Sequence, residues 1–149
     1  VLLRRGASRV YAVDVGHGQL HANLKRDPRV VSLEGLDARR LNPAIIPERV
    51  AAVTADLSFI GLQAALPAAL DRAVAGAWLV ALIKPQFEVG PRGVGKGGIV
   101  RNEEARAEAV AAIEKWIFSR DGWSLLGSIP SPITGGDGNV EYLLAAAKA

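Results

Sequence analysis

Short apolar runs alternate with segments of helical periodicity along the chain, and this alternation constrains the fold more than any other feature. Residues 10–15 (VYAVDV) form an apolar, β-branched run that has the composition of a strand buried on both faces. Residues 18–26 are predicted to be helical, and residues 30–33 and 50–55 to be further strands. Successive βαβ units of this kind predict an α/β fold built on a mostly parallel sheet with right-handed crossovers.

The same pattern continues through the middle of the chain. Apolar residues recur at helical spacing over residues 62–74, and Pro67 is expected to kink this helix or to start its second half. Residues 78–83 (WLVALI) are the most hydrophobic predicted strand, which favours a central place in the sheet. At the front, residues 1–6 have the pattern of a helix end, so the strand and glycine-rich turn that normally open such a fold are missing.

A glycine-rich loop, a helix and two strands complete the pattern. The loop covers residues 86–101, and Asn102 with two following glutamates is a typical helix start. Two strand-like runs, residues 123–129 and 141–147, are joined by turn-forming residues. So short a connection favours an antiparallel hairpin, which makes the last strand antiparallel to the others.

Ionisable residues end or begin three of the predicted strands. Asp56 and Lys84 follow consecutive parallel strands, whose ends would lie about 5 Å apart, so we expect an ion pair. An antiparallel last strand would bring Glu141 to the same edge. Three such groups could orient a hydroxyl or abstract its proton, whereas the alternative is a buried salt-bridge network that closes the sheet.

Asp14 ends the first visible strand, where an acid in a nucleotide-binding α/β fold commonly accepts hydrogen bonds from ribose hydroxyls. The alternative is that Asp14 caps the turn that follows.

Composition limits the class of protein. The chain has 149 residues without cysteine, is 50% hydrophobic and 22% charged, and carries a net charge of +3. These values predict one compact, ordered domain without disulfides and permit an anionic partner. The chain has neither an apolar run of about 18 residues nor a signal peptide, so we expect a soluble, cytoplasmic protein. His17 and His21 lack partners at zinc-site spacing, so no metal site is expected.

The glycine-rich loop carries the most concentrated positive charge. Residues 90–97 fit G-x-x-x-x-G-K, but Gly97 replaces the magnesium-binding Ser or Thr of a P-loop. Arg92, Lys96 and Arg101 predict instead a mobile cationic lid for a phosphodiester backbone, that is, an RNA-binding segment. The alternative is an ordinary solvated loop.

Taken together, several stretches resemble one known family. They are VYAVDVGHGQLHANLKRDPRVVSLEG, DLSFI from Asp56, ALIKPQFEVG, VGKGGIVR, IPSPITG and GNVEYLL. In this order they are similar to the TlyA-like branch of the FtsJ-related (RrmJ-like) ribose 2′-O-methyltransferases, often labelled hemolysin A. The resemblance covers nearly the whole chain.

The resemblance implies a Rossmann-like methyltransferase fold and S-adenosylmethionine-dependent methylation of a cytidine 2′-hydroxyl in ribosomal RNA. Family members use a Lys-Asp-Lys-Glu tetrad, of which three members match Asp56, Lys84 and Glu141. By the same resemblance Asp14 contacts the cofactor ribose, Asp37 lies near its adenine, and Asp56 borders its methionine end.

The N-terminus departs from the family pattern. Related proteins carry an S4-like RNA-binding domain, the first tetrad lysine and an acidic, glycine-rich strand turn, and none of these precedes Val1 in this sequence. We therefore expect a partial methyltransferase domain that binds the cofactor weakly or not at all and is not catalytically competent alone. The alternatives are a non-catalytic RNA-binding or membrane-active module and a nicotinamide-dependent oxidoreductase.

Overall fold

The structure is a computed structural model that describes residues 1–149 with the exception of the Arg92 side chain. The strands are β1 (Val10–Asp14), β2 (Val30–Glu34), β3 (Val50–Ala55), β4 (Ala73–Ile83), β5 (Trp123–Pro130) and β6 (Tyr142–Lys148). The α-helices are α1 (Ala22–Lys25), α2 (Leu62–Ala65), α3 (Pro67–Leu70), α4 (Pro85–Glu88) and α5 (Glu103–Phe118). Short 3-10 turns are η1 (Leu3–Arg5), η2 (Ala38–Arg40) and η3 (Pro91–Gly93).

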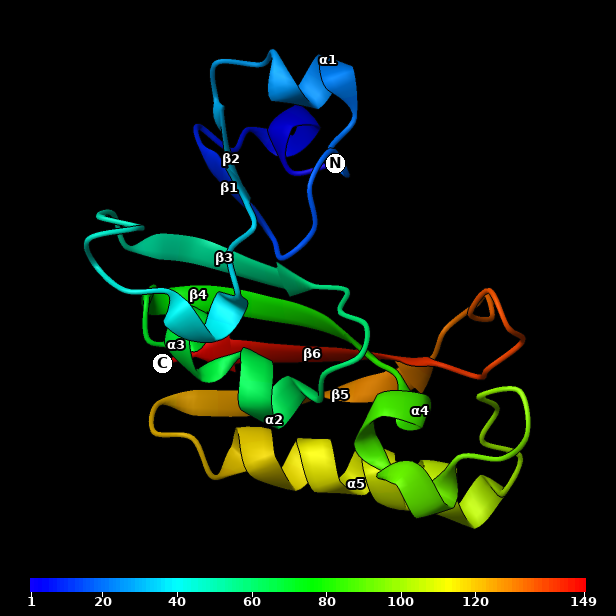
Figure 1. Ribbon diagram of the computed structural model, residues 1–149. Helices are drawn as coiled ribbons and strands as arrows, with labels where there is room; N and C mark the ends of the chain where they lie inside the picture. The colour runs from blue at the N-terminus through cyan, green and yellow to red at the C-terminus, as the bar shows by residue number, and fades with distance from the viewer.

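The strands form two sheets, β1–β2 and β3–β4–β6–β5 (Figure 1). Pairing is parallel between β1 and β2 and between β3 and β4, whereas β6 runs antiparallel to both β4 and β5. The predicted α/β fold, the central place of β4 and the antiparallel last strand are therefore confirmed. The structure differs from a single continuous sheet, because β1 and β3 are not paired to each other.

The core lies on one face of the larger sheet. Leu79, Ala81 and Ile83 of β4 are fully buried on this face, which α2, α3 and α5 cover (Figure 1). Alternate residues of β4 point to the opposite face, where Trp78 and Val80 remain 39% and 38% exposed. The larger sheet thus has one packed face and one apolar face that is partly open to solvent.

The interpretation of residues 10–15 as a strand buried on both faces is wrong. Val10, Tyr11, Ala12 and Val13 are only partly buried, and Asp14 is exposed. The reason is that β1 packs mainly against β2 at one edge, so its two faces are only partly covered by other elements.

Three predicted helices are shorter than expected. The helix after β1 begins only at Ala22, because the His21 side chain caps it by accepting a hydrogen bond from Asn23 N. The helix predicted over 62–74 ends at Leu70, with Pro67 starting its second half as expected. Residues 1–6 contain the 3-10 turn η1 instead of the end of an α-helix. No helix in the described part of the chain is long and apolar enough to cross a membrane.

Candidate functional site

Lys84 and Asp56 meet at the edge where β3 and β4 end, which we call the rim together with Glu141 at the start of β6. Lys84 Nζ lies 2.7 Å from Asp56 Oδ1 and donates a hydrogen bond to Ser58 Oγ at 3.3 Å. The Lys84 side chain is only 14% exposed, whereas that of Asp56 is 72% exposed. The expected ion pair is therefore present, with its acidic partner facing solvent.

Glu141 lies at the same rim but has a different partner. The ladder between β4 and β6 ends at the pair Ile83–Tyr142, and the next residues along the two strands are Lys84 and Glu141. Glu141 is 6% exposed and accepts a hydrogen bond from Gln86 Nε2 at 3.0 Å. Among the described residues, no cation lies within 4 Å of its carboxylate oxygens. The topology thus brings the three residues to one edge, and only two of them form an ion pair.

The short helix α4 was missed by sequence reasoning, although it begins directly after Lys84. Pro85 occupies its first position, where a proline fits because no N–H is needed. Glu88, at its end, accepts a hydrogen bond from Leu62 N at 2.8 Å, and burial raises the pKa of the Glu88 carboxyl. This bond ties α4 to the start of α2, and so to the loop that carries Asp56.

Phe59 is a second feature that the sequence pattern did not reveal. Its φ of 65° lies in the left-handed region, which is rare for a bulky side chain and marks a constrained position. The ring is 91% exposed, and its centroid lies 5.2 Å from that of the Phe87 ring on α4. An aromatic face is therefore presented to solvent three residues after Asp56.

The glycine-rich loop presents part of the expected positive charge. Lys96 and Arg101 are exposed, and the Arg101 guanidinium donates to Lys96 O at 3.4 Å. The side chain of Arg92 lies outside the described residues. The loop is fastened by the buried Asn139, which accepts from Val100 N and donates to the Gly98 carbonyl. The prediction of a mobile lid did not include this anchor, which comes from a residue far along the chain.

Asp14 lines a shallow pocket of about 150 Å³ at the ends of β1 and β2. Asp14 Oδ1 accepts a hydrogen bond from Gly16 N at 2.8 Å, so one of its carboxylate oxygens caps the turn that follows β1. Ser32 Oγ, in the same pocket, is buried and has no hydrogen-bond partner among the described residues. Carboxylate and hydroxyl oxygens at one place suit a ligand that carries hydroxyl groups, such as a ribose.

Asp37 is engaged within its own turn. Its carboxylate caps η2 by accepting from Arg39 N at 2.9 Å, and it also pairs with the Arg39 guanidinium at 2.5 Å. These hydrogen bonds lower the pKa of Asp37 to about 2. The carboxylate is therefore ionised and directed toward Arg39.

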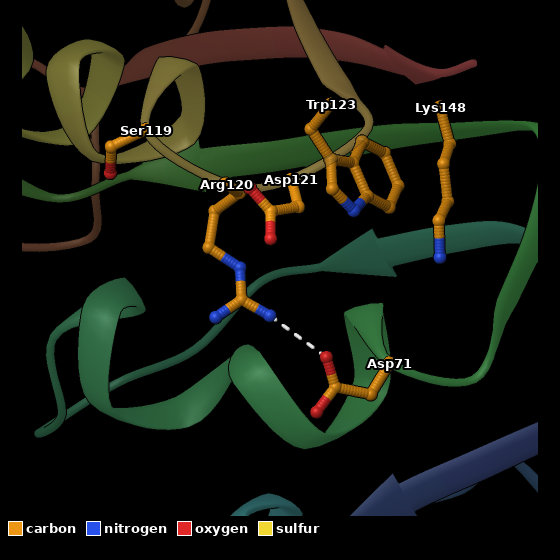
Figure 2. A pocket seen from close by; sticks show the side chains of 6 residues that line it. All are labelled: Asp71, Ser119, Arg120, Asp121, Trp123 and Lys148. Carbon is orange, nitrogen blue, oxygen red and sulfur yellow. Dashed lines mark hydrogen bonds and ion pairs between the residues drawn. The ribbon is translucent and has the colours of Figure 1, made fainter.

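A larger cavity, of about 280 Å³, lies at the opposite end of the larger sheet (Figure 2). It is lined by Asp71, Ser119, Arg120, Asp121, Trp123 and Lys148. Asp71 precedes β4, and Lys84 follows it, so roughly 30 Å of strand separates this cavity from the rim. Its cations are already engaged, because Arg120 pairs with Asp71 and Lys148 donates to the Ala73 carbonyl. The cavity is therefore separate from the candidate site.

Comparisons with known proteins identify the family to which the chain is similar. The TlyA protein of Mycobacterium tuberculosis strain H37Rv, named 16S/23S rRNA (cytidine-2′-O)-methyltransferase, is 50% identical over 144 residues, which cover 97% of this chain and 53% of that protein. Hemolysin A of Brachyspira hyodysenteriae is 40% identical over 95% of this chain and 59% of its own length. The crystal structure of a Lactococcus lactis protein that is 37% identical in sequence matches this structure with a TM-score of 0.93. The match covers 100% of this chain and 71% of that chain.

The chain spans about half the length of the curated relatives that it matches. The family model described as FtsJ-like methyltransferase matches residues 1–148. The chain therefore belongs to the FtsJ-like methyltransferase family.

Proposed function

We propose that this protein methylates the 2′-hydroxyl of a cytidine ribose in ribosomal RNA with S-adenosylmethionine as the methyl donor. The observation that carries the proposal is the Lys84–Asp56 ion pair at the rim, with Glu141 next in register to Lys84. The name of the M. tuberculosis relative supports the choice of substrate. This arrangement would have no function in a membrane-active protein or in a nicotinamide-dependent oxidoreductase. Modification of ribosomal RNA would place the protein in the cytoplasm.

The proposed chemistry depends on the direction of the Lys84 amine. When bound, S-adenosylmethionine supplies an electrophilic methyl group. An ammonium has three N–H donors and no acceptor, so Lys84 can orient the oxygen of a hydroxyl with one donor while Asp56 and Ser58 take the others. As a neutral amine, Lys84 could instead accept the proton that the hydroxyl loses. In either form the low exposure of Lys84 restricts where its nitrogen points.

We place the ribose of the cofactor at the pocket formed by Asp14 and Ser32. The second carboxylate oxygen of Asp14 and the orphaned Ser32 Oγ provide acceptors for a ribose diol. We place the adenine near Asp37 and the methionine end near Asp56, which puts the methyl group within the reach of the rim. The resemblance to the family supports this placement.

We assign RNA binding to the glycine-rich loop. Lys96 and Arg101 are exposed and would contact the phosphodiester backbone, together with Arg92. The loop reaches the rim through Asn139, two residues before Glu141, so RNA held by the loop would be close to Lys84.

We also propose that a preceding segment completes this domain. Arg9 and Tyr11 at the start of β1 both contact Glu48, just before β3, so the two strands start at the same end. Each has one unpaired edge, and a single parallel strand would join the two sheets. The partly open apolar face at Trp78 and Val80 is suited to the helices of such a segment. The S4-like RNA-binding domain of related proteins would precede it.

The experiment that tests this function uses the chain joined to the N-terminal part of the M. tuberculosis relative. This protein is incubated with ribosomal subunits and methyl-labelled S-adenosylmethionine, and the RNA is digested to nucleosides for mass spectrometry. We expect the label in 2′-O-methylcytidine. Label in a base-methylated nucleoside, or label in no nucleoside at all, would contradict the proposal.

A further inference from the structure

Gln86 connects the helix that follows Lys84 to the carboxylate of Glu141. Its Nε2 donates to Glu141 Oε1 at 3.0 Å, whereas its own Oε1 is buried and has no partner among the described residues. The orientation of this amide is fixed by chemistry, because a flipped amide would place its oxygen against a carboxylate oxygen. Gln86 therefore keeps a buried acceptor unpaired while it holds Glu141, and a buried unpaired oxygen costs free energy.

The Glu141 carboxylate is enclosed from a second side. A Cβ at Gly135 would lie 2.7 Å from Glu141 Oε1, so the loop between β5 and β6 packs directly on the carboxylate. Glu141 is 6% exposed, and a buried carboxylate requires donors or cations to compensate for lost hydration. Gln86 Nε2 is the side-chain donor that the described residues provide.

The cation closest in register to Glu141 is Lys84, which is paired with Asp56 instead. If the amide at position 86 were absent, the buried carboxylate of Glu141 would be drawn to the Lys84 ammonium. That pairing would turn the Lys84 amine away from Asp56 and change the direction of the donor that a substrate hydroxyl needs.

We propose that Gln86 is a positioning residue that holds Glu141 apart from Lys84 and so keeps the Lys84 amine directed at the hydroxyl to be methylated. The expected effect on activity rests on the proposed function. The hydrogen bond between Gln86 and Glu141 does not, because it can be tested in the chain itself.

The activity test compares Gln86→Met with Gln63→Met, a matched change at an exposed glutamine of α2, in the completed protein described above. We expect Gln86→Met to lower kcat about tenfold to hundredfold and to leave KM for RNA and S-adenosylmethionine within about twofold. Gln86→Glu should lower kcat as well, because it places two carboxylates next to each other. This second variant shows whether a loss of activity in Gln86→Met comes from a folding defect of that variant alone. An unchanged kcat in both Gln86 variants would overturn the proposal.

A double variant separates positioning from a general structural role. Because Gln86 acts through Glu141, Gln86→Met combined with Glu141→Gln should have the kcat of Glu141→Gln alone, within about twofold. Losses that multiply would show that Gln86 does not act through Glu141, and would overturn the proposal.

A measurement on the chain alone keeps the two proposals distinguishable. In nuclear magnetic resonance spectra the side-chain amide protons of Gln86 should exchange with solvent more slowly than those of Gln63, and Glu141→Gln should shift them. If the completed protein has no activity but the Gln86 amide protons exchange slowly, the proposed function fails, whereas the hydrogen bond from Gln86 to Glu141 is supported. If the Gln86 amide exchanges as fast as that of Gln63, the inference on Gln86 fails whatever the activity.

Discussion

Replacement of Asn139 by alanine tests how the glycine-rich loop is held beside the rim. Asn139 is 2% exposed; its Oδ1 accepts from Val100 N at 3.0 Å, and its Nδ2 donates to Gly98 O at 2.9 Å. The two bonds are unequal, because Val100 is buried and Gly98 is exposed. Water can replace the donor to Gly98, but the amide of Val100 would be left without a partner, at a cost of about 1–3 kcal/mol.

We therefore expect Asn139→Ala to lower the free energy of unfolding by about 1–3 kcal/mol, which corresponds to a fall in Tm of about 2–12 °C for a chain of this size. Urea titration followed by circular dichroism measures the change. Asn23→Ala, at an exposed asparagine of α1, is the control and should change stability by less than about 0.5 kcal/mol. Equal losses in the free energy of unfolding for Asn139→Ala and Asn23→Ala would contradict the role of Asn139 as the anchor of the loop.

Two further predictions concern pH dependence and the space around Glu141. Hydrogen bonds from Arg39 lower the pKa of Asp37 to about 2, so this pair stabilises the fold above the ordinary carboxyl pKa and loses its contribution as the pH falls toward 2. Arg39→Ala should return the Asp37 pKa toward about 4 in a carbon-detected titration, and an unchanged value would refute the assignment. Gly135→Ala should lower methyl transfer by the completed protein because its Cβ would displace the Glu141 carboxylate, whereas a Cβ at Gly136 meets nothing within 4 Å. Equal activities of the Gly135→Ala and Gly136→Ala proteins would count against a role for Glu141.

The meeting of Asp56, Lys84 and Glu141 at one edge could be predicted because it depends only on topology. Parallel strands that follow each other in sequence end at the same edge, and an antiparallel hairpin returns its last strand to that edge. The registers of β3 with β4 and of β4 with β6 confirm this arrangement. The partner of Glu141 was not predictable in the same way, because Gln86 is 55 positions away and belongs to an unpredicted helix.

Features that depend on short segments or on long-range packing could not be predicted from the sequence pattern. Helix α4 spans four residues, too few to show a helical period. Ala73 and Val74 fit the helical spacing of the preceding residues, yet β4 starts at Ala73 because Ala73 pairs with Val50. The partial burial of β1 was not predictable either, because the apolar composition of a strand does not show which elements pack on its faces.

Methyl transfer by the Lys84→Ala variant of the completed protein is the most direct test of the central claim, that the Lys84 amine at the rim positions the hydroxyl that is methylated. Lys115→Ala, at an exposed lysine of α5, is the matched control. We expect Lys84→Ala to abolish methylation of ribosomal RNA and to bind S-adenosylmethionine with unchanged affinity in calorimetry, while Lys115→Ala retains full activity. Turnover by Lys84→Ala at the rate of the control would contradict the claim.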